Sequence, residues 1–165
     1  LLYHRQIKVL DFIFARFTIE LLGGMMAYLF AAVLLIALGE FPLPANIGLL
    51  IAGWFIYSLF CFAISLVIAP LSEMSEVLEK FIPVVTYIMI PVSGLPYMVS
   101  WMTPTIREYL LWSPFVNAME MMRSGIWGNQ VTAYYNIWNP IGCSAVLILL
   151  GLTLCRRVRR TLAIE

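Results

Sequence analysis

The sequence predicts an all-α membrane protein with four transmembrane helices and two short re-entrant or interfacial helices before the last of them. Two observations predict this class. Of the 165 residues, 62% are hydrophobic and only 12% are charged, and the mean hydropathy is +0.93, far above the range of soluble domains. Four apolar runs also reach the length of about 20 residues that is needed to cross about 30 Å of hydrocarbon. A net charge of +1 excludes a nucleic-acid-binding arm.

The four spans follow from the stretches that lack charges. Residues 21–38 carry no charge, and the first span extends back to residue 12. The third run is interrupted by Pro83, Pro91 and Pro96, so we expect this helix to be kinked or broken, as transporter helices beside a substrate route often are. The predicted spans are residues 12–38, 47–69, 81–99 and 137–155.

The basic residues gather on one side of these spans, which predicts the orientation because cytoplasmic loops retain Lys and Arg. The two ends and the middle loop, residues 72–80, hold eight of the ten: Arg5, Lys8, Arg16, Lys80, Arg156, Arg157, Arg159 and Arg160. The other side holds Arg107 and Arg123. We therefore expect both ends, including a tail at residues 156–165, in the cytoplasm. The arginines of the tail also fit a patch that binds anionic lipid.

The segment before the last span is rich in aromatic residues and in helix-start signals. Together with Trp138 at the start of the last span, it holds four of the five tryptophans, the others being Trp101, Trp112 and Trp127, which is typical of a membrane interface. Thr103-Pro104 and Ser113-Pro114 each combine an N-cap residue with proline at the first helical position. These signals predict two short helices over residues 103–125, ended by Gly125. A helix of about ten residues covers only about 15 Å, so neither helix can span a membrane.

The second short helix is expected to be amphipathic. Asn117, Glu120 and Ser124 share its polar face and Arg123 lies beside them, while the other face is apolar. Glu120 and Arg123 are three residues apart and can pair. One interpretation is a local ion pair that lets a short helix dip into the membrane. The other is a polar gate at the outer mouth of a pathway.

The first span carries a face of small residues. Gly23, Ala27 and Ala31 recur every four residues, which predicts close packing against another helix. Near the start of this span, Arg16 and Glu20 are four residues apart and are expected to form an interfacial ion pair, in preference to a proton relay through Glu20.

The second span carries a stripe of polar-edged side chains. Trp54, Tyr57, Ser58, Cys61 and Ser65 follow the three-and-four spacing of one helical face. Such a stripe can pack against a partner helix through hydrogen bonds, or it can line a path for an amphipathic ligand such as a sugar chain, whose C–H faces stack on aromatic rings. Both interpretations stay open at this stage.

Known catalytic and nucleotide-binding patterns are missing from the sequence. It contains no phosphate-binding loop of the G-x-x-x-x-G-K-[ST] type, no G-x-S-x-G and no H-E-x-x-H. Its three cysteines lie in apolar runs, and its one histidine, His4, has no ligand-spaced neighbour. We expect no enzyme activity, no cofactor and no metal. If the chain serves ATP-driven transport, a separate subunit must hydrolyse the nucleotide.

Several segments, taken in order, resemble the ABC-2 type permeases, especially the inner-membrane components of capsular polysaccharide exporters. These segments are LYHRQIKVLD at residues 2–11, SEM at 72–74, PVSGLP at 91–96, and YLLWSPFV at 109–116 followed by Glu120 and Arg123. Each motif alone has little specificity, and their order carries the resemblance.

The resemblance implies a homodimeric permease, bound to two copies of an ABC ATPase subunit, that passes a lipid-linked polysaccharide across a bacterial inner membrane. The chain, residues 1–165, would be an N-terminally truncated ABC-2 transmembrane domain whose crossings match spans three to six of six. Residues 1–11 would form the cytoplasmic coupling loop. Its ATPase-coupling residues would be Tyr3, His4, Arg5, Gln6 and Lys8.

The resemblance also assigns roles to two sets of residues. The substrate pathway would include Trp54, Tyr57, Ser58 and Ser65. The periplasmic gate would include Trp112, Asn117, Glu120 and Arg123. Alternatives are an ABC-2 permease for a small solute or drug, and a membrane scaffold with no transport role.

Overall fold

The computed structural model describes residues 9–162, and all the regular structure within this range is helical. The long helices are α1 (Val9–Ala37), α2 (Ile47–Met74), α3 (Glu76–Val92) and α6 (Trp138–Leu162). The shorter elements are η1 (Val99–Trp101), α4 (Pro104–Leu110), α5 (Pro114–Trp127) and η2 (Gly128–Gln130). The predicted all-helical class is thus confirmed for the described part of the chain.

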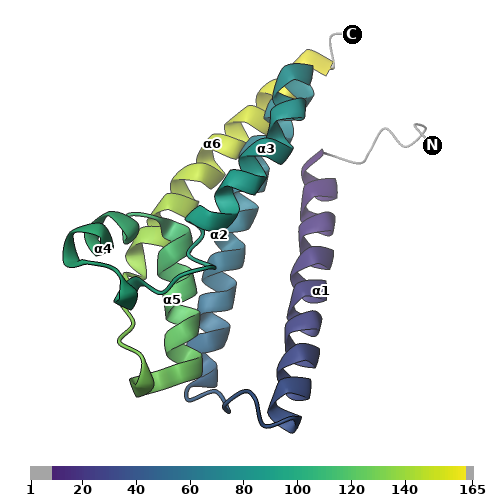
Figure 1. Cartoon of the computed structure of the whole chain (residues 1–165). Helices are drawn as coiled ribbons and strands as arrows, with labels where there is room; N and C mark the ends of the chain where they lie inside the picture. Colours follow the sequence, from purple (N-terminus) through teal and green to yellow (C-terminus); the bar gives the residue numbers. More distant parts are fainter. Residues whose placement is uncertain (1–8, 163–165) are drawn as a thin grey trace.

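Helix α2 is the centre of the fold. In Figure 1, α5 packs against the first half of α2 and α6 against the second half, so that α5 and α6 together cover one side of it. Glycines allow these close approaches. A Cβ atom at Gly125 would lie 2.5 Å from the backbone nitrogen of Leu50, and a Cβ at Gly151 would lie 2.8 Å from the carbonyl carbon of Leu66. The three helices therefore form the tightly packed core.

Helix α1 stands apart from this core (Figure 1). It contacts α2 through aromatic pairs: the Phe17 and Phe62 rings are 4.8 Å apart between centroids, and the Tyr28 and Trp54 rings 6.0 Å. Within the described residues, no helix covers the predicted packing face of Gly23, Ala27 and Ala31. Gly23 has no atom within 4 Å of where its Cβ would be, because the adjacent Gly24 faces Trp54 instead. The small-residue face is rotated away from α2 by one position.

The predicted third span is only partly helical. Helix α3 begins at Glu76 and ends at Val92, and its 17 residues extend about 26 Å. The chain then turns at Gly94, whose φ is +80°, a conformation that glycine adopts without strain. Within the described residues, three helices are long and apolar enough to cross a membrane: Leu10–Ala37, Ile47–Met74 and Trp138–Arg157. The four-span arrangement therefore stays a prediction.

The expected middle loop, residues 72–80, is almost entirely helical. Helix α2 continues to Met74, α3 starts at Glu76, and Ser75 between them has extended backbone. Pro70 lies inside α2 and is buried. The two helices therefore turn back on each other at a single non-helical residue.

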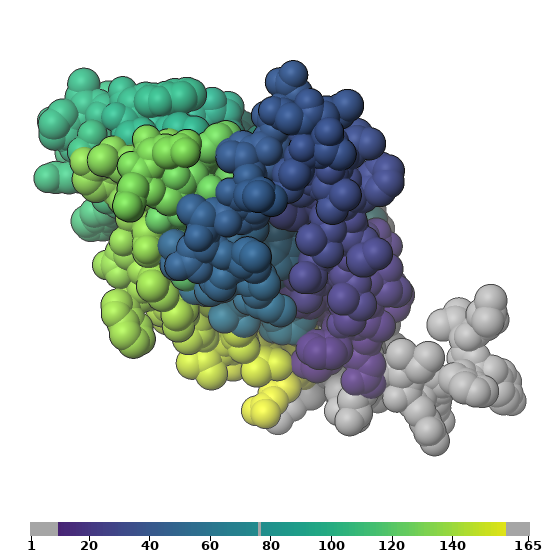
Figure 2. All heavy atoms as spheres, turned by 90° about the horizontal axis from the view of Figure 1, so that it is seen from below, coloured from purple at the N-terminus to yellow at the C-terminus, as the bar shows by residue number. Residues whose placement is uncertain are grey.

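The segment between α3 and α6 lies at one side of the core. Helix α4 projects from it (Figure 1), and Figure 2 shows the α1–α2 loop lying between α1 and the α5–α6 connection. The two predicted short helices begin at Pro104 and Pro114, as expected. The second continues past Gly125, since Gly125 packs on α2, and it ends before Gly128, whose φ is +54°.

Candidate functional site

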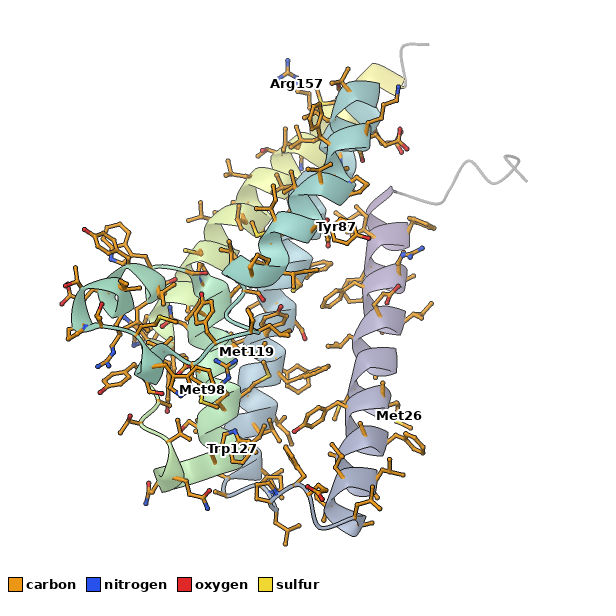
Figure 3. All side chains as sticks on the ribbon, in the orientation of Figure 1. Met26, Tyr87, Met98, Met119, Trp127 and Arg157 are labelled. Atoms are coloured by element: carbon orange, nitrogen blue, oxygen red, sulfur yellow. The ribbon has the colours of Figure 1, made fainter. Side chains whose placement is uncertain are left out.

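A groove of about 610 Å³ lies between α1 and the core. Its α1 wall includes Phe12, Ile13, Phe17, Leu21 and Gly24, and its opposite wall comes mainly from α2, with Leu95, Met119 and Met122. Figure 3 shows side chains of α1 and α2 projecting into the space between the two helices, with Met119 of α5 on the core side. The lining is mostly apolar.

The polar stripe predicted on α2 lies along this groove. Trp54, Tyr57, Ser58, Cys61 and Ser65 all line it. The Ser65 hydroxyl donates to the Cys61 carbonyl at 3.0 Å and is satisfied within its own helix. The indole nitrogen of Trp54 is buried, and no described residue accepts a hydrogen bond from it. The structure therefore brings the stripe together on one wall and gives it an unused donor.

The α1 wall of the groove carries charge midway along its length, between Phe12 and Gly24. Arg16 and Glu20 line it there and form the predicted ion pair, with 3.4 Å between Nη2 and Oε1. Their side chains are 71% and 69% exposed, so the pair contributes little to stability. Arg16 and Glu20 are the charged residues among those that line the groove.

A second candidate site is a buried ion pair on α5. Glu120 and Arg123 pair at 2.8 Å, as predicted, with side chains 1% and 13% exposed. The guanidinium also donates to the carbonyls of Gly94 at 2.6 Å and Tyr97 at 2.6 Å. A third bond, 3.1 Å long, reaches the carbonyl of Leu95. Arg123 thus clamps the turn that follows α3.

The hydrogen bonds from Arg123 satisfy carbonyl groups that have no helical partner after the end of α3. Carbonyl groups of a turn at membrane depth must find donors within the protein, because hydrocarbon offers none. Arg123 supplies these donors, and Glu120 compensates its charge while its Oε1 accepts from the Val99 backbone N–H at 3.2 Å. Since Leu95 also lines the groove, the clamp fixes part of the groove wall.

Glu120 retains one unused acceptor. Its second oxygen, Oε2, is buried and has no hydrogen-bond partner among the described residues. The expected polar face of α5 is therefore not a solvated face: Glu120 and Asn117 are both fully buried within the chain.

Asn117 joins the start of α5 to the start of α6. Its amide nitrogen donates to the carbonyls of Leu111 at 2.6 Å and Ser113 at 2.9 Å. Its amide oxygen accepts from the Asn136 backbone N–H at 2.6 Å. Asn139 of α6 also donates to the Leu111 carbonyl, at 3.3 Å. These hydrogen bonds hold the start of α5 next to the start of α6.

The four predicted gate residues do not form one cluster. Asn117, Glu120 and Arg123 lie in buried polar networks, whereas the Trp112 side chain is 81% exposed. Trp112 meets these networks through its backbone, whose carbonyl accepts from the Asn139 side-chain amide at 3.2 Å. The predicted coupling residues Tyr3, His4, Arg5, Gln6 and Lys8 lie outside the described residues.

Sequence reasoning missed several partners. The carbonyls of residues 94–97 were not assigned to Arg123, although the proline-broken run indicates unpaired carbonyls there. Asn136 and Asn139, directly before and within the start of α6, give a polar signal that could have marked the junction. Asn46 caps α2 by accepting from the Leu49 N–H at 3.0 Å, while Thr103 and Ser113 make no side-chain cap.

Metal and disulfide chemistry find no site within the described residues. No group of three His, Cys, Asp or Glu side chains in residues 9–162 could hold a metal ion. Cys61, Cys143 and Cys155 are free thiols.

Comparison with known proteins finds that the chain is similar to proteins named for capsule polysaccharide export or polysialic acid transport. It is 35% identical over 154 residues to the capsule polysaccharide export inner-membrane protein CtrC of Neisseria meningitidis serogroup B, covering 93% of this chain and 58% of that protein. It is 29% identical over 156 residues to the corresponding BexB protein of Haemophilus influenzae, covering 94% of this chain and 59% of BexB. The polysialic acid transport protein KpsM of Escherichia coli is 23% identical over 160 residues, 93% of this chain and 59% of KpsM.

Two further comparisons found nothing. No family model matches the chain, and no solved structure matches it. The chain spans about three fifths of the length of the curated relatives it matches. The resemblance seen in the ordered motifs is confirmed by these relatives: over nearly its whole length, this chain is homologous to capsule polysaccharide export inner-membrane proteins.

Proposed function

We propose that this chain is part of the permease subunit of an ATP-driven exporter, which moves a lipid-linked surface polysaccharide of the capsule or O-antigen type across a bacterial inner membrane. The relatives are named for capsule polysaccharide export at the inner membrane, and three of the described helices are long and apolar enough to cross a membrane. Because these residues contain no phosphate-binding loop, ATP hydrolysis is assigned in this proposal to a partner ABC ATPase. The resemblance implies two copies of that ATPase on a permease homodimer.

The observation that carries this proposal is the groove between α1 and α2. A polysaccharide presents hydroxyl groups and apolar C–H faces together, so it needs aromatic rings and hydrogen-bond donors on one wall. Trp54 and Tyr57 supply the rings, while Ser58 and the unused Trp54 indole N–H supply polar contacts. In this proposal Trp54, Tyr57, Ser58 and Ser65 contact the passing polymer.

The Glu120–Arg123 clamp has a positioning role in the same proposal. It ties α5 to the turn at Gly94 and holds Leu95 at the groove. Asn117 fixes the α5–α6 junction beside it. These residues are proposed to keep the outer end of the pathway in shape, and Trp112 to lie at the outer membrane interface, where indole rings are favoured.

The experiment uses the complete permease with its ATPase in living cells. Trp54→Ala and Tyr57→Ala together should reduce surface polysaccharide strongly while the level of permease in the membrane stays normal, because only the groove wall changes. Matched controls are Phe55→Ala on α2 and Tyr87→Ala on α3, which are exposed aromatic residues outside the groove lining. Unchanged export in the double variant would exclude the groove as the polymer's path.

The coupling residues have a separate test. Replacing Arg5 and Lys8 with Glu reverses two charges in the proposed coupling loop and should weaken binding of the ATPase subunit, measured by co-purification from membranes. Normal co-purification and normal ATP hydrolysis would exclude this loop as the docking element.

A further inference from the structure

The groove ends where Trp54 of α2 meets α1. Along α1 the lining runs from Phe12 to Gly24, and along the antiparallel α2 it runs from Ala69 to Trp54. The Cζ2 and Cη2 atoms of Trp54 lie 3.5 and 3.6 Å from the position of a Cβ on Gly24, so the ring edge contacts α1 there. Tyr28 follows about one helical turn later, with its ring centroid 6.0 Å from that of Trp54. The Tyr28–Trp54 contact therefore lies across this end of the groove.

Both rings carry a hydrogen-bond donor that this contact leaves unused. The Tyr28 hydroxyl and the Trp54 indole nitrogen are buried, and neither has a hydrogen-bond partner among the described residues. A buried donor that has no acceptor destabilises the state that buries it. Hydrocarbon offers no acceptor either. The contact is thus stabilised by ring packing and opposed by two unpaired donors.

Helix α1 is packed loosely enough to move away from Trp54. No residue in its most apolar window is buried against the rest of the described chain. Ring pairs such as Phe17–Phe62 and Tyr28–Trp54 join it to α2. Helix α5, in contrast, approaches α2 so closely at Gly125 that no Cβ fits there. A displacement of α1 would therefore break ring contacts and leave the packing of the core unchanged.

We propose that Tyr28 is a further residue that contacts the substrate, and that the Tyr28–Trp54 contact opens by displacement of α1 when the polymer passes. The Tyr28 hydroxyl and the Trp54 N–H then donate to oxygen atoms of a sugar, while the rings stack on its C–H faces. A sugar supplies acceptors and apolar faces together, whereas an apolar solute supplies no acceptor. This inference rests on the proposed function, because it adds a residue of α1 to the path that the α2 stripe lines.

The first test removes the hydroxyl of Tyr28 and keeps its ring. In the complete permease, Tyr28→Phe should lower the rate of polysaccharide export about fivefold, the effect of one lost hydrogen bond. Its thermal unfolding midpoint in detergent should stay the same or rise, because the resting state no longer buries an unpaired hydroxyl. Tyr87→Phe on α3 is the matched control and should change neither value, since Tyr87 is 74% exposed and lies outside the groove lining.

The second test measures the movement of α1 while both rings stay in place. Spin labels are attached to Met26→Cys on α1 and Phe55→Cys on α2, two exposed positions, in complete permease that lacks all other cysteines. With its ATPase bound, the distance between these labels should increase when the lipid-linked polysaccharide is added. A reference pair at Phe55 and Leu149, an exposed residue of α6, should keep its distance.

Three results would each overturn the proposal. Normal export by Tyr28→Phe would show that the hydroxyl does not contact the polymer. A lower unfolding midpoint of Tyr28→Phe would show that the hydroxyl has a partner in the resting protein. An unchanged distance between positions 26 and 55 would show that α1 does not move.

The double variant of Trp54 and Tyr57 separates this inference from the proposed function. If that variant loses export while Tyr28→Phe exports normally, the path along α2 holds and the role of Tyr28 alone is wrong. If the double variant exports normally, the path itself is wrong and the role of Tyr28 is overturned with it.

Discussion

The two ion pairs of this chain have the same chemistry in two very different regions. Arg123 and Glu120 lie in the core formed by α2, α5 and α6, where the guanidinium is held by three carbonyls as well as by the carboxylate. Arg16 and Glu20 lie on α1, more than two thirds exposed, and Arg16 has no further protein acceptor in the described structure.

The glycines of the two regions differ in the same way. In the core, Gly53, Gly125 and Gly151 sit where no Cβ fits, whereas Gly23 on α1 faces open space. The core is therefore specified by contacts within the chain. The surface of α1, by contrast, is largely uncovered by the described residues, and the groove lies between α1 and the core.

The largest effect is expected from opening the buried pair. Arg123→Met leaves Glu120 buried without a counter-charge and the carbonyls of Gly94, Leu95 and Tyr97 without donors. The variant should lose about 3–5 kcal/mol of stability. Thermal unfolding of the purified permease in detergent measures this loss of stability. An unfolding midpoint equal to that of the unchanged protein would mean that the hydrogen bonds of Arg123 do not stabilise the fold.

A smaller loss is expected from filling the closest helix contact. Gly125→Ala puts a methyl group 2.5 Å from the Leu50 nitrogen and should cost up to about 3 kcal/mol through overpacking of α5 on α2. Gly23→Ala is the matched control on α1, and there alanine should raise stability by about 0.5–1 kcal/mol through its better helix propensity. Equal responses at the two positions would remove the distinction between core and α1.

The junction between α5 and α6 should respond next. Asn117→Leu keeps a similar side-chain volume but leaves the Asn136 N–H and the Leu111 carbonyl with fewer partners, at a cost of about 2 kcal/mol. Asn129→Leu, on the exposed η2, should leave the unfolding midpoint almost unchanged. If Asn129→Leu proves as harmful as Asn117→Leu, the amide network does not fix the two helices.

The smallest effect is expected from the exposed pair on α1. Arg16→Met should change stability by less than about 0.5 kcal/mol, because an exposed ion pair is weakened by solvent and by the entropy of its long side chains. The same unfolding measurement used for Arg123→Met gives the comparison directly. A loss as large as that of Arg123→Met would show that α1 is part of the rigid core.

Much of the fold follows from local sequence signals. Long uncharged runs marked α1, α2 and α6, Thr103-Pro104 and Ser113-Pro114 marked the starts of α4 and α5, and helical spacing placed the α2 stripe on one face. Each of these features depends on residues that are close together in the chain, so the local sequence pattern is sufficient to predict it.

The remaining features depend on contacts between distant residues. The end of α3 before Gly94 is stabilised by Arg123, 29 residues further on, and no local pattern links the two. The small residues of α1 have the spacing of a packing face, yet which face meets α2 is decided by how Tyr28, Gly24 and Trp54 fit together. The groove itself arises between helices, and the sequence could indicate only one of its walls.

Site-specific photo-crosslinking in living cells tests most directly whether the polysaccharide passes along this groove. A benzoylphenylalanine in place of Tyr57 lies on the groove wall, and the same residue in place of Leu149 lies on an exposed face of α6. During export, light should attach polysaccharide to the permease from position 57 and not from position 149. Absence of the adduct at position 57 in an exporting strain, or equal adducts at both positions, would contradict the proposed path.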